Sequence, residues 1–540
     1  MASFTRISLA LLTGTAALAL AACDGADGVA SPGGVIGGTP APSPTPTPTP
    51  TPTPAPSAIA AFAETAQSGI TVTRDEQLAV VNAGTNNNLS GVNPLNGFLP
   101  IGAAATATAF NASTINPFFV ATSYIGAVNP AGDTWYQGWT CNSSTANFGS
   151  TSGSCSAVPT IAATATPAAT ACPAGTTAAG TNTNYRLCVL PALVSGNLSL
   201  PAIAGIAYQI NGRVDVGVDT GGDGTAAGGA AATLTFAAGS LIVSNSSDAA
   251  NDYLVVNRGS RLNAIGTATA PIIFTSQQNL NSASNGDATQ GQWGGIILTG
   301  KAQISNCNAT GIAGGAANCQ NVVEGTGNAL YGGATAADNS GTLQYVQIRY
   351  SGIAISEGNE LQGLTLGGTG SGTTLDHIQV HNSSDDGIEI FGGRSNLKYL
   401  ALTGSDDDGL DTDVGWQGMV QFAIVAQKVG GATTDSFSSE IDSNGNEDFI
   451  PRQKGKLANF TFIQTANAPA AIRLRGGADY TFMNGIVKSV VPCLNMVAGT
   501  EANGGKSTIR PAGGTGAVPT TIEEDGPPVF RSVYFACNNA

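Results

Sequence analysis

The sequence predicts an all-β protein, a right-handed parallel β-helix, and three observations support this fold class. Short runs rich in Val, Ile, Leu and Thr, such as 233–236 and 253–256, are bounded by Gly and other turn residues. A Gly-Ser step recurs twenty residues on, at 239–240 and 259–260, and such a period is typical of a solenoid. Two adjacent 22-residue blocks, 375–396 and 397–418, align without gaps and are identical at six positions.

Each block alternates apolar and polar residues, which is the pattern of a half-buried strand. A third block begins at Met419 and keeps the same rhythm. We therefore expect two or three short strands per block, with one set of apolar side chains facing a core. The residues expected to point inward are Ile378, Val380, Leu400, Leu402, Phe422 and Ile424. A leucine-rich repeat is the main rival, but its Leu/Asn spacing is absent.

The composition agrees with short strands joined by turns. The 540 residues include 72 Gly, and only 10% are charged. The formal net charge is −15, and it becomes −16 on removal of an N-terminal leader that carries Arg6 and no acid. An acidic chain without clustered Lys and Arg argues against nucleic acid as a partner.

Residues 1–22 read as a lipoprotein signal peptide, with Arg6 at its start and an apolar run up to Ala22. The run ends in Leu-Ala-Ala-Cys, which resembles a bacterial lipobox, so Cys23 is the expected lipidation site. An ordinary signal peptide that ends near a Cys is the alternative. We expect a lipid-anchored protein of the cell envelope, with the outer membrane favoured. Asp24 resembles an inner-membrane retention signal, which leaves the choice of membrane open.

Three further regions follow the leader. Residues 23–60 form a Thr/Pro-rich, disordered linker that favours extended polyproline II. Residues 61–195 form a small disulfide-containing region with an aromatic cluster that includes Trp135 and Trp139, and residues 196–540 form the β-helix.

Cysteine content indicates an oxidising compartment. Apart from Cys23, eight Cys remain. The sequence contains no C-x-x-C pair, which argues against a zinc site. Pairing of sequence neighbours, which is one of many possible connectivities, predicts Cys141–Cys155, Cys172–Cys188, Cys307–Cys319 and Cys493–Cys537.

Several segments resemble the pectin-lyase-like superfamily, and more closely a group of largely uncharacterised bacterial β-helix lipoproteins. They are Trp293–Leu298, Gly341–Arg349 and the DDGIEIFGG stretch at 385–393, within a similarity that covers about 200–490; Tyr124–Thr140 is similar as well. The resemblance implies the fold. It implies little about activity, because this superfamily includes lyases, hydrolases, adhesins and stalks.

Acidic residues recur at the spacing of one coil. Stacking of the two blocks places Asp385 over Asp407, Asp386 over Asp408, and Glu389 over Asp411, about 4.8 Å apart. Asp413 extends the row. Each like-charged pair costs roughly 3 kcal/mol before screening at an effective dielectric constant near 20. Three explanations stay open: a bound calcium ion held by these seven carboxylates, neutralisation by the outward-facing Arg473 and Arg475, or solvated Asp-Gly turns.

The only two histidines, His377 and His381, share an outward face with Gln379. We expect them to lie beside the acids, where they would either take part in acid–base chemistry or simply occupy an exposed sheet.

Three functions follow, and the first is favoured. One is a non-catalytic, calcium-stabilised scaffold that binds a polysaccharide or an envelope protein. The second is a calcium-dependent polysaccharide lyase or a glycoside hydrolase. The resemblance implies for a lyase that calcium acidifies a sugar proton and that Arg473 or Arg475 removes it. The third is a structural stalk or adhesin.

Overall fold

The fold is known from a computed structural model. It describes residues 81–82, 108–129, 131–158, 171–247, 251–281, 284–356, 358–428, 433–443, 448–465, 468–496, 508, 510–515 and 518–537. The expected leader, Cys23 and the linker to residue 60 lie outside the described residues. Within the described part, no helix has the length and hydropathy needed to cross a membrane.

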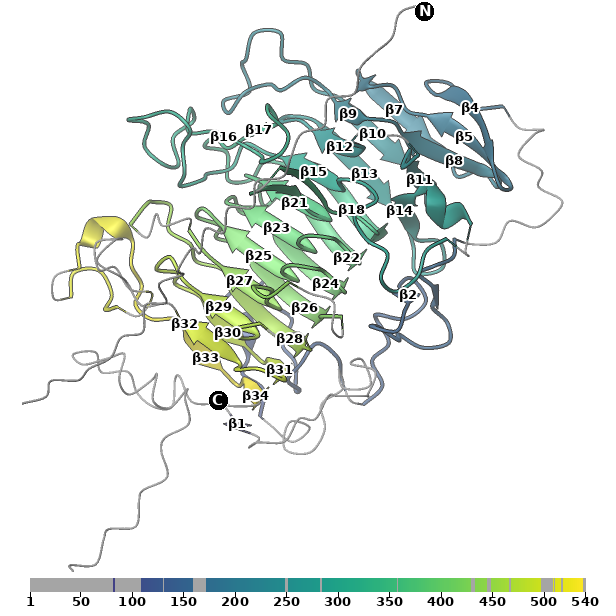
Figure 1. The fold of residues 1–540 in the computed structure, drawn as a ribbon. Coiled ribbons are helices and arrows are strands. Elements are labelled where there is room, and N and C mark those ends of the chain that lie inside the picture. Colours follow the sequence, from purple (N-terminus) through teal and green to yellow (C-terminus); the bar gives the residue numbers. More distant parts are fainter. Residues whose placement is uncertain are drawn as a thin grey trace, which may run out of the picture. The chain divides into compact units, whose positions relative to one another are not determined.

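One face of the molecule is a ten-stranded parallel sheet to which each coil contributes one short strand (Figure 1). Its strands follow one another in chain order along the stack. They are β6 (Leu193–Val194), β9 (Arg213–Val216), β12 (Tyr253–Val256), β15 (Ile296–Thr299), β21 (Leu364–Gly367), β23 (Ile388–Phe391), β25 (Leu410–Asp413), β27 (Ser439–Ile441), β29 (Ile472–Leu474) and β32 (Leu494–Met496).

The second sheet has eighteen strands and wraps the rest of each coil. Its strands are β1 (Val81–Asn82), β4 (Thr177–Asn182), β5 (Tyr185–Val189), β7 (Asn197–Leu200), β8 (Ile206–Ile210), β10 (Thr233–Phe236), β11 (Leu241–Ser244), β13 (Arg261–Ile265), β14 (Ile272–Ser276), β18 (Gly341–Arg349), β22 (Thr374–His381), β24 (Asn396–Thr403), β26 (Met419–Ala426), β28 (Lys456–Gln464), β30 (Thr481–Met483), β31 (Ile486–Ser489), β33 (Val529–Arg531) and β34 (Tyr534–Cys537). Except for the β4–β5 hairpin, neighbouring strands in this sheet pair in parallel.

Few other regular elements occur among the described residues. Three strand pairs lie outside the coils: β2 (Cys141–Asn142) with β3 (Gly153–Ser154), β16 (Asn321–Val322) with β17 (Leu330–Tyr331), and β19 (Ile353–Ser356) with β20 (Asn359–Leu361). The helical elements in the described part are 3-10 turns, namely η3 (Ala112–Thr114), η5 (Gln277–Leu280) and η7 (Thr520–Ile522). The fold is therefore a right-handed parallel β-helix, as predicted from the repeats.

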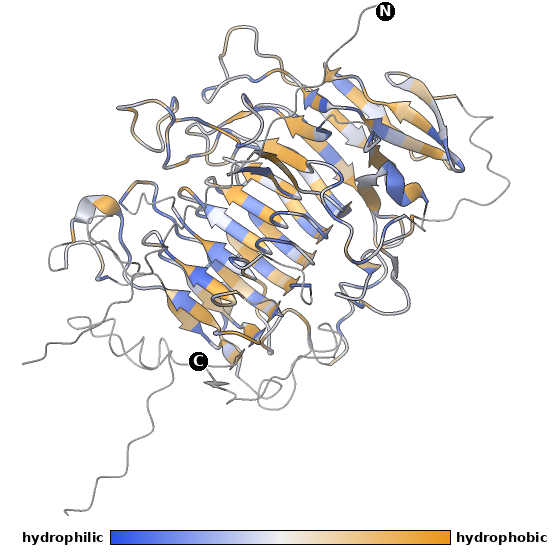
Figure 2. Ribbon diagram, in the orientation of Figure 1, coloured by the Kyte–Doolittle hydropathy of each residue, from blue (hydrophilic) through white to orange (hydrophobic). Residues whose placement is uncertain are grey.

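The core is a set of stacked apolar columns inside the coils. Leu375 pairs with Leu397, and Ile388 with Leu410, which is the offset of the 22-residue repeat. All four side chains are buried in one continuous core. Hydrophobic and hydrophilic residues alternate along the strands (Figure 2). Burial of each Leu or Ile contributes about 1.5–3 kcal/mol relative to exposure, so the columns hold successive coils together.

The third block departs from the prediction that Phe422 and Ile424 point inward. Leu397 pairs with Val420, and Leu400 with Ala423, so this repeat is one residue longer. The extra residue lies in the connection from β25 to β26. Because side chains alternate with a period of two, a one-residue shift exchanges the two faces of the strand. Val420, Ala423 and Val425 fill the core instead, and Phe422 and Ile424 face outward.

The long strands bend at one residue with a positive φ. In β18, β22, β24 and β26 this residue is Tyr345 (φ 51°), His377 (54°), Tyr399 (58°) and Phe422 (63°). Left-handed backbone is unusual for bulky residues, and here their rings stack outside the coils. Ring centroids lie 4.2 Å apart for Tyr345–His377, 4.3 Å for His377–Tyr399 and 4.9 Å for Tyr399–Phe422. We call these four residues the corner stack.

Residues 108–129 and 131–158, here the N-terminal strap, lie along the outer face of the eighteen-stranded sheet. Outward amide side chains bind the strap backbone: Asn484 Oδ1 accepts from the Phe110 N–H (2.7 Å), Gln421 Oε1 from Val120 (2.8 Å) and Gln379 Oε1 from Cys141 (2.7 Å). Trp135 and Trp139 pack against the corner stack. The aromatic cluster of the disulfide-containing region therefore covers the β-helix.

Four disulfides join Cys141 to Cys155, Cys172 to Cys188, Cys307 to Cys319 and Cys493 to Cys537. These are the pairs that sequence proximity predicts. The parallel ladder begins before residue 196, because β5 pairs with β8 and β6 with β9. Cys188 lies within β5, so the second disulfide belongs to the first coil of the β-helix.

Candidate metal centre

The acidic row lies on the outward side of the ten-stranded sheet, where the repeat stacks equivalent residues. Glu389 of β23 pairs with Asp411 of β25, Asp411 with Glu440 of β27, and Glu440 with Arg473 of β29. Ile388, Leu410 and Ile441 point into the core, so the alternating residues beside them point away from it. Asp385 and Asp386 precede β23, and Asp407 and Asp408 occupy the corresponding turn before β25.

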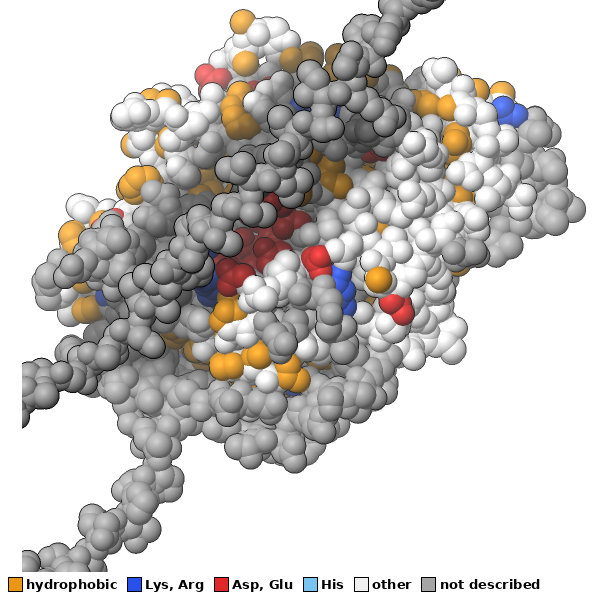
Figure 3. Space-filling view, viewed as in Figure 1, with side chains coloured by type: hydrophobic (Ala, Val, Ile, Leu, Met, Phe, Trp, Pro, Cys, Tyr) orange, Lys and Arg blue, Asp and Glu red, His pale blue; other side chains and the backbone are white. Residues whose placement is uncertain are grey.

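Loops from distant parts of the chain close around this row and form a hollow of about 250 Å³. Figure 3 shows the acidic side chains gathered in a depression over the middle coils. The hollow is lined by twelve acids, together with Gln362, Phe391 and Arg475: Glu324, Glu360, Asp385, Asp386, Glu389, Asp407, Asp408, Asp411, Asp413, Asp435, Glu440 and Asp442. We call this feature the acidic hollow.

Glu324 and Asp435 reach the hollow from loops and Glu360 reaches it from the short strand β20 outside the coils, and the sequence alone did not single them out. Glu324 lies between β16 and β17, Glu360 in β20, and Asp435 before β27. Gln362 connects Glu324 to the acidic row, because its Nε2 donates to Glu324 Oε1 (2.7 Å) and Asp385 Oδ2 (3.3 Å). No repeat relates these loops to the coils, so only the folded chain brings them together.

Four of the predicted acids (Asp386, Glu389, Asp408 and Asp413) are buried and the other three (Asp385, Asp407 and Asp411) are partly buried, so they are not fully solvated turn residues. Glu389 is 7% exposed and Asp408 is 4% exposed. Burial raises the pKa of Asp385 to about 8, with a further contribution from Asp407. Burial and Asp442 likewise raise the pKa of Asp413 to about 8. Burial and the neighbouring Asp386 hold the pKa of Glu389 well above its ordinary value.

One end of the row is neutralised by arginine, and we call it the paired end. Arg475 Nη2 lies 2.8 Å from Glu440 Oε1 and 2.9 Å from Asp442 Oδ2. Arg473 Nη1 lies 3.5 Å from Glu440 Oε2 and 3.1 Å from Asp435 Oδ2. Burial lowers the pKa of Arg475, but Asp442 and Glu440 outweigh this and raise its pKa above the ordinary value. The two arginines thus neutralise three acids that lie beyond the seven expected carboxylates.

Backbone N–H groups bind the carboxylates of two turn acids, Asp386 and Asp408. Asp386 Oδ1 accepts from the Asp408 N–H (2.8 Å), and Asp408 Oδ1 accepts from the Phe437 N–H (2.5 Å). Each carboxylate therefore ties its own coil to the next. These bonds fix the orientation of Asp386 and use one oxygen of Asp408.

The other end of the row, Asp385, Asp386, Glu389, Asp407 and Asp411, has no ion pair with Lys or Arg among the described residues, and we call it the free end. Within the described part of the chain, Glu389 Oε2 is buried and has no hydrogen-bond partner. A buried carboxylate oxygen without a partner is costly. The free end is therefore the part of the row whose charge the protein leaves uncompensated.

The free end has the donor atoms and spacing of a calcium site. Two groups, Asp385–Asp386–Asp407 and Asp386–Glu389–Asp411, each place three carboxylate oxygens within 4.8 Å of one another. Oxygens that coordinate calcium lie about 2.3–2.6 Å from the ion, so two ligands of one ion are at most about 5 Å apart. Each group meets that limit. Asp408 and Asp413, also expected as ligands, accept hydrogen bonds from the Phe437 and Val414 N–H groups.

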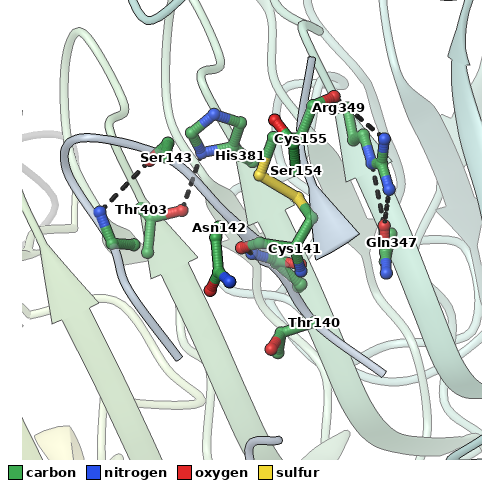
Figure 4. The surroundings of a disulfide bond; sticks show 12 residues. Thr140, Cys141, Asn142, Ser143, Ser154, Cys155, Gln347, Arg349, His381 and Thr403 are labelled. Carbon is green, nitrogen blue, oxygen red and sulfur yellow. Dashed lines mark hydrogen bonds between the residues drawn. A yellow bond between two sulfur atoms is a disulfide. The ribbon is translucent and has the colours of Figure 1, made fainter. Parts of the chain in front are cut away.

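The prediction that the histidines lie beside the acids is wrong. Both belong to β22, in the other sheet, and neither lines the acidic hollow. His377 is held in the corner stack. His381 is 1% exposed, its Nδ1 lies 2.9 Å from Thr403 Oγ1, and it is covered by the strap near the Cys141–Cys155 disulfide (Figure 4). Burial and the nearby Arg349 lower the pKa of His381 to about 3, so it stays neutral.

Comparison with known proteins identifies the family. A family model described as a pectate-lyase-like β-helix domain matches residues 223–510, which include every residue that lines the acidic hollow. No curated protein and no solved structure matches the chain. The resemblance to the pectin-lyase-like superfamily is confirmed, and because the match spans more than half of the 540 residues, the chain belongs to the family of pectate-lyase-like β-helix domains.

Proposed function

We propose that this protein is a non-catalytic binding scaffold of the cell envelope, anchored through a lipid on Cys23, with calcium bound in the acidic hollow. The observation that carries the proposal is the free end. There, five carboxylates converge, and Glu389 presents a buried oxygen that has no partner within the described residues. The partner of the scaffold is a polysaccharide or an envelope protein.

Calcium suits this site better than other common metals. The side chains at the free end offer only carboxylate oxygens, which hard cations prefer, whereas zinc and copper favour nitrogen and sulfur. Calcium also accepts irregular arrangements of six to eight oxygens, while magnesium requires near-octahedral geometry and keeps much of its water. Fixed carboxylates on stacked strands, supplemented by water, can supply the irregular set of six to eight oxygens that calcium accepts.

The geometry favours a scaffold over a lyase. Either arginine would have to lose a proton before it could act as a general base. Arg475 is held by Glu440 and Asp442, which raise its pKa, and Arg473 is paired with Asp435 and Glu440. Both guanidinium groups are thus engaged in ion pairs with acids of the paired end, which suits a structural counter-ion.

Calorimetric titration of the purified full-length chain with calcium tests the metal half of the proposal. We expect binding in the micromolar range that is reduced in Glu389→Gln, which keeps the shape of the side chain and removes its charge. Asp223→Asn is the matched control, because Asp223 is an exposed loop acid outside the hollow. Absence of calcium binding in the unaltered protein would overturn this half.

Assays with acidic and neutral polysaccharides test the non-catalytic half. We expect calcium-dependent retention of a polysaccharide or an envelope protein without any cleavage products. Unsaturated sugar products that form only with calcium, and disappear in Arg475→Lys, would show a lyase and refute the scaffold.

A further inference from the structure

The free end contains two ligand groups. Asp385, Asp386 and Asp407 form one, and Asp386, Glu389 and Asp411 form the other. Within each group the candidate oxygens lie within 4.8 Å of one another, and the two groups have only Asp386 in common. The five carboxylates therefore form two overlapping clusters.

A single ion is a poor match to this arrangement. Ligands of one calcium ion lie within about 5 Å of one another, and the five carboxylates do not form one group at that separation. An ion held by Glu389 and Asp411 would leave Asp385 and Asp407 without a cation. These two acids are bound only by neutral groups among the described residues, Gln362 and Thr433 respectively.

The charge around the free end gives a second reason. Glu324, Glu360, Asp408 and Asp413 also line the hollow, and the described Lys and Arg residues near it pair instead with Asp435, Glu440 and Asp442. One divalent cation would offset only two negative charges. Two cations would offset four and would still leave the hollow acidic, so their mutual repulsion is balanced by surrounding carboxylates.

Asp386 is built to lie between the two clusters. The Asp408 N–H fixes its Oδ1, and its side chain is 6% exposed. Glu389, 7% exposed and without a partner for Oε2 in the described structure, faces the second cluster. A carboxylate shared between two cations about 3.5–4 Å apart is the usual way to hold a pair of ions close together.

We infer that the acidic hollow binds two calcium ions that share Asp386, one held with Asp385 and Asp407 and the other with Glu389 and Asp411. This inference rests on the proposed function, because it concerns the same hollow and the same metal. The turn acids supply the first site and the strand acids supply the second.

Native mass spectrometry and calcium titration of the full-length chain test the inference by counting ions. The unaltered protein should bind two ions, and Asp407→Asn and Glu389→Gln should each bind one. Asp386→Asn should bind none with comparable affinity, whereas the control Asp223→Asn should bind two. Terbium luminescence gives an independent count, and circular dichroism checks that each variant is folded.

The outcomes separate the two proposals. One ion in the unaltered protein, lost in both Asp407→Asn and Glu389→Gln, would refute the pair of ions and leave the calcium scaffold intact. No bound ion would refute both. If Asp386→Asn fails to fold, the two other variants still decide, because two sites predict half occupancy in each and a single site predicts none.

Discussion

The two ends of the acidic row arise from the same repeat, yet their charges are compensated differently. At the paired end, Glu440 and Asp442 lie against Arg475, whose two contacts are 2.8 and 2.9 Å. At the free end, Glu389 occupies the equivalent position two strands earlier, and Thr365 of β21 is its neighbour on the far side. Stacked like charges repel unless a cation lies beside them. Within the described chain, only the paired end has such a cation, the Arg475 guanidinium.

This difference separates stability from binding. A buried carboxylate beside a fixed guanidinium is a completed ion pair, and removal of either partner leaves a costly charge. A buried carboxylate without a cation is a deficit that a ligand can fill.

Removal of both arginines should have the largest effect. Arg473→Gln with Arg475→Gln leaves Glu440 buried without a cation, and we expect the free energy of unfolding to fall by about 3 kcal/mol. The estimate is at the low end for buried pairs because the Arg475 side chain is 37% exposed. Urea unfolding measures the change. The control is Arg473→Lys with Arg475→Lys, which keeps both positive charges. Calcium should restore part of the loss, because the paired end then resembles the free end.

A rise in pH without calcium should weaken the fold next most strongly. Burial, together with neighbouring acids, raises the pKa of Asp385 and Asp413 to about 8, from 3.8. Between these values the folded protein holds protons that the unfolded chain releases, so stability falls as pH rises towards 8. His381 opposes this trend weakly, because its imidazole is already neutral in the fold while the unfolded form, with a pKa of 6.5, still loses protons just above pH 6.5. We expect a loss of about 2 kcal/mol from pH 6.5 to 8.

Thermal unfolding at the two pH values, with a chelator and with excess calcium, measures this effect. Calcium should flatten the dependence, because it binds the deprotonated carboxylates. Stability that rises between pH 6.5 and 8 in the chelator would contradict the assigned direction of these pKa shifts.

Replacement of equivalent acids should give opposite signs at the two ends. Without calcium at pH 8, Glu389→Gln should raise the free energy of unfolding by about 1 kcal/mol, because it removes an uncompensated charge. Glu440→Gln should lower it by about 1 kcal/mol, because the partly buried Arg473 and Arg475 lose a partner. Urea titrations of both variants compare the signs directly. Destabilisation by both would show that Glu389 is already compensated.

The sequence predicted the parts of this comparison that depend on periodicity. The repeat placed Glu389 over Asp411, and Arg473 and Arg475 were correctly expected to face outward, on either side of the buried Leu474. It did not predict Glu324 or Glu360, since these come from a loop and a hairpin strand that have no register to the coils. Nor did it predict that Phe422 and Ile424 face outward, because one added residue in a turn leaves the apolar rhythm unchanged and reverses its direction.

The histidines illustrate a related limit. Alternation correctly placed His377 and His381 on the outside of β22, but it does not tell which sheet of the coil an outward residue belongs to. Nor does it show that residues some 240 positions earlier cover that face, as the contact of Gln379 with Cys141 does. Burial of an outward face by a distant strap is a tertiary event without a local signal.

The smallest effect should come from the exposed edge of the paired end. Asp435 contacts Arg473 at 3.1 Å, but its side chain is 66% exposed. Solvent screens such a pair, so Asp435→Asn should change the free energy of unfolding by less than about 0.5 kcal/mol. Urea unfolding beside Glu440→Gln measures the difference between an exposed and a buried partner of one arginine. An equal loss in both variants would contradict this expectation, because the exposed Asp435 and the buried Glu440 would then contribute the same free energy of unfolding.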